Sequence, residues 1–191
     1  MALLISGACF AQADSTGTAS GDGVVASERG IIIHRTTLTL TDVAVTLVDN
    51  AGTTAYGSLK VYDMPAGAIK VLGVTASLNT AATTLGVDVD AAGDFGLGTV
   101  AANNTATPLA TTEQNLIANT ALTFADVDNL GAEDTTAYTS LIAAAFDGTS
   151  TAMDVYVNFL IDDADHDVTT TPCDLTLNGT ITFTWVNLGD Y

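Results

Sequence analysis

Apolar and polar residues alternate with a period of two over two long runs near the end of the chain. One run covers residues 153–161, and a second covers residues 175–185, where threonine is common in the opposite phase. A strand places successive side chains on opposite faces of a sheet, so these runs predict antiparallel strands with one buried face. We expect Val157, Phe159, Phe183 and Trp185 to lie in the core. The second run ends near the C-terminus, which should be tied into the sheet.

Other strand-like runs precede these two. They cover residues 31–47, 56–64, 69–78, 85–89 and 95–100, and turn-forming Gly, Pro, Asn and Asp residues separate most of them. The apolar phase changes by one residue at Thr41 and Asp42, which predicts a β-bulge or a tight turn there. Eight or more strands of this kind predict an all-β fold, an antiparallel β-sandwich that is jelly-roll-like.

The middle of the chain has weaker patterns. Thr111 is followed three residues later by Gln114, a spacing typical of a capping box, which predicts one helical turn. Residues 135–146 suit a short helix or a strand, and we favour strand or loop for much of this segment.

The length of 191 residues suits one domain with an arm. We assign residues 1–30 to an extended N-terminal arm and residues 31–191 to the β-sandwich domain, because residues 11–30 are small, polar and glycine-rich. Residues 1–13 also imitate a secretory signal, but they lack its basic start, and Ser6 and Gly7 interrupt the apolar run. The remaining sequence predicts no membrane span, which would need about 18 or more consecutive apolar residues.

The charge of the chain excludes several functions. It has 22 acidic and 4 basic residues, a net charge of −18 at pH 7, and a hydrophobic content of 48%. Binding to nucleic acid needs clustered Lys and Arg, so neither DNA nor RNA is an expected partner. Disordered acidic tails are poor in apolar residues, so we expect a folded anionic protein. Salt should relieve its self-repulsion.

Two acidic clusters are candidate cation sites. Asp88, Asp90 and Asp94 surround a glycine-containing turn, and residues 162–167 combine aspartates with His166. Calcium is bound by such oxygen-rich loops, but the first cluster does not have the EF-hand spacing. We interpret the first as a hairpin turn and the second as a solvated loop, and we expect neither to bind a cation.

The sequence offers little for catalysis. His34 and His166 are the only histidines, so a Ser-His-Asp triad has few available bases, and we interpret His34 as a structural residue on a strand. His166 and Cys173 are too few for a zinc site. Cys9 and Cys173 lie far apart in sequence, and two unpaired thiols are favoured over a disulfide. We expect no catalytic residue, no metal and no cofactor, and therefore no enzyme.

Four stretches of the sequence carry a likeness to known proteins. They are TTLTLTDVAVTLVDNAGTTAYGSLKVYDMPAGAI at residues 36–69, FGLGTVA at 95–101, TTEQNLI at 111–117, and FDGTSTAMDVYVNFLIDDADHDVTTTPCDLTLNGTITFTWVNLGDY at 146–191. From residue 35 to the C-terminus the chain resembles a family of virion structural proteins of tailed bacteriophages, especially phages of marine bacteria. The long C-terminal stretch is the most specific.

The resemblance implies a virion role. Within that role it implies a capsid decoration, or cement, protein on the outer surface of the head. The implied partners are the major capsid protein and further copies of the chain, with a homotrimer as the expected state, and neither nucleic acid nor a membrane is implied.

Three other functions stay open. The chain could be a jelly-roll coat subunit, a head fibre or a tail component of the same virion. It could be a secreted β-domain of the cell surface, such as a pilin or an adhesin, with residues 1–13 as its signal. A calcium-dependent carbohydrate-binding module would rest on the acidic loops alone.

Overall fold

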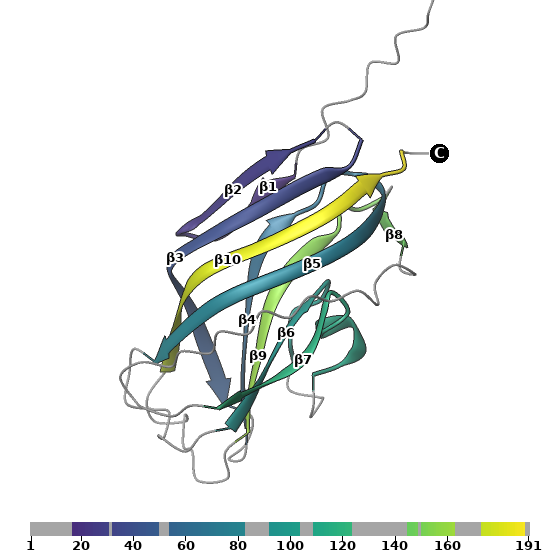
Figure 1. Ribbon diagram of the computed structural model, residues 1–191. Coiled ribbons are helices and arrows are strands. Elements are labelled where there is room, and N and C mark those ends of the chain that lie inside the picture. The colour runs from purple at the N-terminus through teal and green to yellow at the C-terminus, as the bar shows by residue number, and fades with distance from the viewer. Residues whose placement is uncertain are drawn as a thin grey trace, which may run out of the picture.

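The computed structural model describes residues 17–30, 32–49, 54–82, 92–103, 109–123, 145–148, 150–162 and 173–189. Strands in this part of the chain join into one 10-stranded sheet, and every pairing is antiparallel. The order is β7-β6-β9-β4-β3-β10-β5-β8, with β1 beside β4 and β2 beside β3 (Figure 1). The strands are β1 (Thr18–Ala19), β2 (Val24–Arg29), β3 (His34–Asp49), β4 (Thr54–Asp63), β5 (Gly67–Ala82), β6 (Ala92–Gly98), β7 (Ile117–Thr123), β8 (Ala145–Gly148), β9 (Asp154–Asp162) and β10 (Cys173–Asn187).

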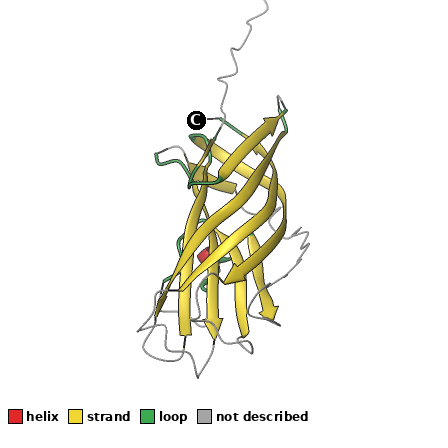
Figure 2. Cartoon of the chain, turned by 90° about the vertical axis from the view of Figure 1, so that its left-hand side faces the viewer, coloured by secondary structure: helices red, strands yellow, loops and turns green. Residues whose placement is uncertain are grey.

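The sheet curls back on itself, and β3 makes the corner. Along one edge β3 pairs with β10 from His34 to Leu47. Along its other edge the first half of β3 pairs with β2, and only residues 47–49 pair with β4. Strands β4, β9, β6 and β7 therefore lead away from the far end of β3 and come to face β3, β10 and β5 (Figures 1 and 2). Side chains from both halves meet in one hydrophobic core.

The predicted all-β, antiparallel fold class is confirmed. Val157, Phe159, Phe183 and Trp185 are each 0% exposed. Strand β10, which carries the last two, lies between β3 and β5, so the C-terminal strand is central in the sheet. The core is enclosed by one continuous curled sheet, because β3 pairs with strands of both halves. A period of two identifies the buried face of each strand, but it does not identify its neighbours.

Residues 17–30 fell within the arm that the sequence predicted, yet the structure pairs most of them with the sheet. Strand β2 pairs with β3 along its whole length, and β1 pairs with β4 through two residues. Gly21 and Gly23 have positive φ angles in the turn between β1 and β2, a conformation that glycine adopts without strain. These turn glycines gave the segment its linker-like composition. Residues 1–16 of the arm lie outside the described residues.

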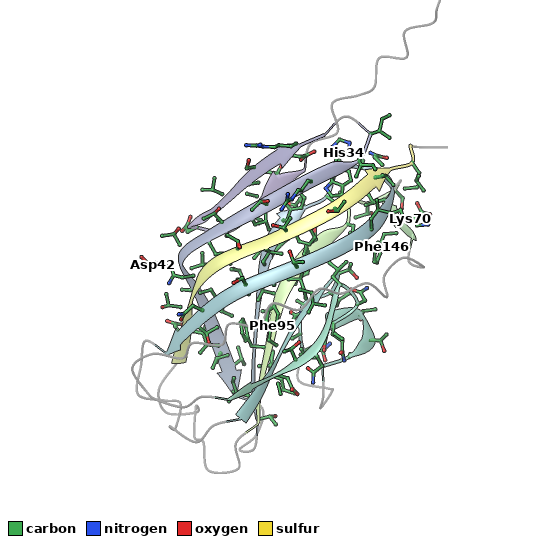
Figure 3. All side chains as sticks on the ribbon, in the orientation of Figure 1. His34, Asp42, Lys70, Phe95 and Phe146 are labelled. Carbon is green, nitrogen blue, oxygen red and sulfur yellow. The ribbon has the colours of Figure 1, made fainter. Side chains whose placement is uncertain are left out.

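The phase change at Thr41 and Asp42 is a β-bulge, as predicted. Asp42 has a φ of 51°, and the register of β10 against β3 shifts between Leu177 and Gly179. The Asn178 side chain accepts a hydrogen bond from the Asp42 N–H at 2.9 Å. Strand β3 bends near Asp42, where it passes toward the corner (Figure 3).

Gly179 tests how strictly this bulge depends on glycine. Its φ is +135°, and an added Cβ would lie 2.1 Å from the Ser77 carbonyl oxygen. We expect Gly179→Ala to lower the free energy of unfolding by about 1–3 kcal/mol. Gly73 on the neighbouring strand is the matched control, because its added Cβ would meet nothing within 4 Å. Gly73→Ala should be neutral or stabilising by about 0.4–1 kcal/mol. Urea unfolding of both variants checks this, and equal effects would contradict it.

Candidate functional site

The acidic clusters singled out in the sequence fall largely beyond the described ranges. Asp88, Asp90 and residues 163–167 lie outside them, as does Cys9, while Asp94 is on β6 and Asp162 ends β9. Within the described ranges no three or more His, Cys, Asp or Glu side chains gather as metal ligands would. The same ranges contain no helix with the length and apolar character needed to cross a bilayer.

A buried polar cluster joins the N-terminal strands to the core. The Glu28 carboxylate on β2 accepts a hydrogen bond from the Tyr62 hydroxyl at 3.1 Å. Its other oxygen lies 2.9 Å from Nδ1 of His34, which must carry the hydrogen because a carboxylate only accepts. The His34 ring stacks on Trp185 with centroids 4.3 Å apart, and the Trp185 indole N–H donates to the Thr36 hydroxyl at 2.9 Å.

This arrangement fastens the sheet together. A carboxylate bonded to an imidazole provides two of the three members of a catalytic triad, which also needs a hydroxyl at the other ring nitrogen. Nε2 of His34 is buried and has no hydrogen-bond partner in the described part of the chain. The nearby Tyr62 and Thr36 hydroxyls serve Glu28 and Trp185 instead. Glu28 on β2 thus connects this strand to β3 through His34 and to β4 through Tyr62, at a place where β3 and β4 do not pair with each other.

Tyr62 gives this cluster a pH signature. Burial, with a smaller effect of the nearby Glu28 carboxylate in the same direction, raises the pKa of Tyr62 to about 12. A tyrosine in the unfolded chain has a pKa of about 10, so between these values the folded state holds a proton that the unfolded state has lost. Stability should therefore be fully present below pH 10 and fall as the pH rises toward 12. The urea midpoint should fall less steeply over this range in Tyr62→Phe, and parallel curves would contradict the assignment.

A second polar cluster lies on the outer face of β9. Asn158 is 0% exposed, and its side-chain amide donates to the carbonyls of Val100 at 3.0 Å and Glu113 at 2.7 Å. Its side-chain oxygen accepts from the Ala102 N–H at 2.9 Å and from the Ser58 hydroxyl at 2.6 Å. Asn158 therefore holds segments on both sides of residues 104–108 against β4 and β9.

Glu113 stabilises the segments that Asn158 attaches to β9, residues 99–103 and 109–117, through hydrogen bonds between them. It belongs to the 3₁₀ turn η1 (Thr111–Glu113) and is 1% exposed. Its carboxylate accepts hydrogen bonds from the backbone N–H groups of Asn103 at 3.0 Å and Ala110 at 2.6 Å. The predicted single turn is present, but Glu113 provides the capping contact that the Thr111 and Gln114 spacing had suggested. Gln114 instead bonds to the Leu109 carbonyl and the Asn119 N–H.

A partly exposed ion cluster lies beside this region on the outer face of β4 and β9. The Lys60 ammonium is 2.8 Å from a carboxylate oxygen of Asp63 and 3.5 Å from one of Asp154. Hydrogen bonding to Asp63 is the largest cause that holds the pKa of Asp154 below its usual range, and the Tyr156 hydroxyl and Lys60 add to it. Two carboxylates share one ammonium here, which leaves the cluster acidic.

The opposite outer face, on β2, β3, β10 and β5, carries rows of small hydroxyl side chains. Its cross-strand rows are Val25–Thr39–Thr180–Ser77, Ser27–Thr37–Thr182–Thr75 and Arg29–Arg35–Thr184–Gly73, followed by Val186–Lys70. These positions alternate with core residues and are half-buried or exposed. We call this surface the threonine face. Three of the chain's 4 basic residues lie on it, and none of the positions in its rows is acidic.

Sequence reasoning missed Glu28, Asn158 and Glu113. Glu28 fell in a segment assigned to the arm, and Asn158 fell in the outward phase of its strand. One signal for Asn158 was present: Leu160 is apolar in the same outward phase, which indicates that something covers the outer face there. In the structure Leu160 is buried with Ala102 and Leu109 in a second small core.

Comparison with known proteins adds no relative. Neither the protein-family models, nor the curated proteins, nor the solved structures contain a match to this chain.

Proposed function

We propose that the chain is a head decoration protein of a tailed bacteriophage, which binds the outer capsid surface and stabilises the shell. The observation that carries the proposal is where the resembling sequence lies in the fold. The likeness runs from residue 35 to the C-terminus, and these residues include β3 to β10. Its most specific stretch contains β9 and β10, which face each other across the core.

The architecture suits a subunit that works by surface contact. We infer that the curled sheet is a jelly-roll-like sandwich, because successive connections such as β4 to β5 and β9 to β10 pass from one half of the sheet to the other. The conspicuous polar groups of the core serve to fix strands and residues 99–103 and 109–117 in place. The broad threonine face is available for contact with another protein.

The charge suits the outside of a shell. With a net charge of −18 the chain would be repelled by packaged DNA, and many copies at high local concentration would stay soluble. We propose the major capsid protein and other copies of the chain as its partners, with a trimer as the assembled unit. No enzymatic step is proposed.

Binding to shells tests the function. Purified protein should co-sediment with head shells assembled from the cognate major capsid protein, and the loaded shells should withstand higher temperature than bare shells. A variant that lacks residues 1–16 keeps β1, β2 and the Glu28 contacts, so it should fold, and loss of its binding would assign attachment to residues 1–16. Protein that stays in the supernatant at every salt concentration would defeat the decoration role.

A further inference from the structure

We infer that the cationic end of the threonine face binds the acidic Asp63–Asp154 cluster of a second copy of this chain. The contact joins two different surfaces, one from each copy. The inference extends the self-association within the proposed function by naming the surfaces that meet.

The first surface is basic, although the chain as a whole is strongly acidic. Arg29, Arg35 and Lys70 lie toward one end of the threonine face, with no acidic residue in the rows between them. None of the three forms an ion pair within the described part of the chain. Lys70 lies near the same end of the sheet as His34, the neighbour of Arg35 (Figure 3). The rows themselves carry no acidic residue, and Asp147 of the neighbouring strand β8 lies opposite Ala68, two residues from Lys70. In a chain with 22 acidic residues, rows with this charge are suited to an acidic partner.

Two of these cations oppose each other directly. Arg29 and Arg35 are cross-strand partners, and both are exposed. Like charges directly opposite on adjacent strands destabilise a sheet. A carboxylate placed between two guanidinium groups removes this repulsion and accepts charge-assisted hydrogen bonds. The arginine pair therefore gains most from a partner that presents carboxylates.

The same chain presents such carboxylates on its other side. Asp63 and Asp154 are cross-strand partners on β4 and β9, and both side chains are 35% exposed. Lys60 is the one ammonium between them. Lys60 contacts one oxygen of each carboxylate, and the Tyr156 hydroxyl donates to the other oxygen of Asp154 at 3.0 Å. Each carboxylate can still accept further hydrogen bonds, because its two oxygens offer about four acceptor sites.

The placement of the two surfaces determines the kind of assembly. The core lies between β3, β10 and β5 on one side and β4 and β9 on the other, so the two surfaces point in opposite directions. Both lie toward the end of the sheet where β2, β4 and β10 finish (Figure 1). Because the two surfaces point in opposite directions, a single two-fold interface cannot contain both, so the contact must be head-to-tail, which closes into a ring or continues as a filament.

Exposed aliphatic side chains flank the arginine pair. Ile32 is 74% exposed, Ile33 is 55% exposed, and Leu188 beyond the end of β10 is 45% exposed. Trp185 of β10 is the partner of His34 of β3, so the turn before β3 and the segment after β10 lie at the same end of the sheet. These side chains supply apolar area beside the charge pairs.

Two charge-removing variants separate this contact from a general effect of charge. Arg35→Gln and Lys60→Gln each make the net charge more negative by one. Arg35→Gln removes a cation from the binding face and should raise the self-association constant Kd about tenfold. Lys60→Gln removes the cation from the acidic cluster and should leave Kd unchanged or lower it. Sedimentation equilibrium of the full chain measures both, with circular dichroism as the check on folding.

A mixing experiment then tests the head-to-tail geometry. Arg29→Glu/Arg35→Glu disables the cationic surface, and Asp63→Asn/Asp154→Asn disables the acidic one. Each double variant alone should be monomeric, but an equimolar mixture should form a one-to-one complex, because one intact surface of each kind remains. A mixture that stays monomeric while the parent chain self-associates would overturn the inference.

Shell binding separates this inference from the proposed function. If Arg29→Glu/Arg35→Glu still self-associates but no longer co-sediments with shells, the threonine face docks on the capsid, and the inference fails while the decoration role stands. If the parent chain self-associates through these surfaces but never binds shells, the inference stands and the decoration role fails.

Discussion

Trp185→Ala should lower the free energy of unfolding by about 3–5 kcal/mol, the range found when a large buried aromatic side chain is removed. Trp185 is 0% exposed and stacks on His34. The substitution would leave a cavity beside the imidazole and would remove the indole donor from the Thr36 hydroxyl, which is also buried. Urea unfolding followed by circular dichroism measures the loss.

Two variants show where the loss originates. Trp185→Phe keeps most of the apolar area but not the N–H donor, so it should cost less than Trp185→Ala. Thr180→Ala changes an exposed position on the same strand and should remain within about 0.5 kcal/mol of the parent. If Trp185→Ala and Thr180→Ala were equally mild, the indole would not be the centre of the core.

Asn158→Ala should cost about 3 kcal/mol, because it leaves two buried and two partly buried polar groups without their partner. The Ala102 N–H, the Val100 and Glu113 carbonyls and the Ser58 hydroxyl all bond to this one side chain. Hydrogen exchange should also accelerate at the amides of residues 99–103 and 109–117, since these residues would lose their main attachment to β9.

The control for Asn158 is another asparagine. Asn178 also bonds a backbone N–H and a carboxylate, but its contacts with Asp42 are exposed to solvent. Water can replace exposed hydrogen bonds, so Asn178→Ala should cost well under half as much as Asn158→Ala. If both substitutions had the same effect, burial would not explain how much the Asn158 hydrogen bonds contribute to stability.

The sequence predicted the strand faces well, because the period of two is a local property. Residues 153–161 and 175–185 alternate without help from their neighbours, and the phase change at Asp42 marked a bulge that the structure contains. The corner at β3 could not be predicted in this way. It depends on which strand pairs with residues 47–49 and which with residues 34–40, and pairing partners leave no mark on the apolar pattern.

The functional surfaces were harder to predict for the same reason. Arg29 was assigned to the arm and Arg35 to a strand, so nothing in the sequence placed them opposite each other. Once β2 pairs with β3, the register brings the two arginines together and sets Lys70 two strands away. Asp63 and Asp154 likewise become neighbours only through the register of β4 and β9. The net charge of −18 therefore gave no indication that three of the 4 basic residues lie together on the threonine face.

Cryo-electron microscopy of cognate head shells mixed with the purified protein shows whether the protein binds the outer surface of the shell. We expect added density on the outer surface of the shell that is missing from untreated shells, and the curled sheet should fit into it in several contacting copies. Shells that are identical with and without the protein would contradict the decoration role.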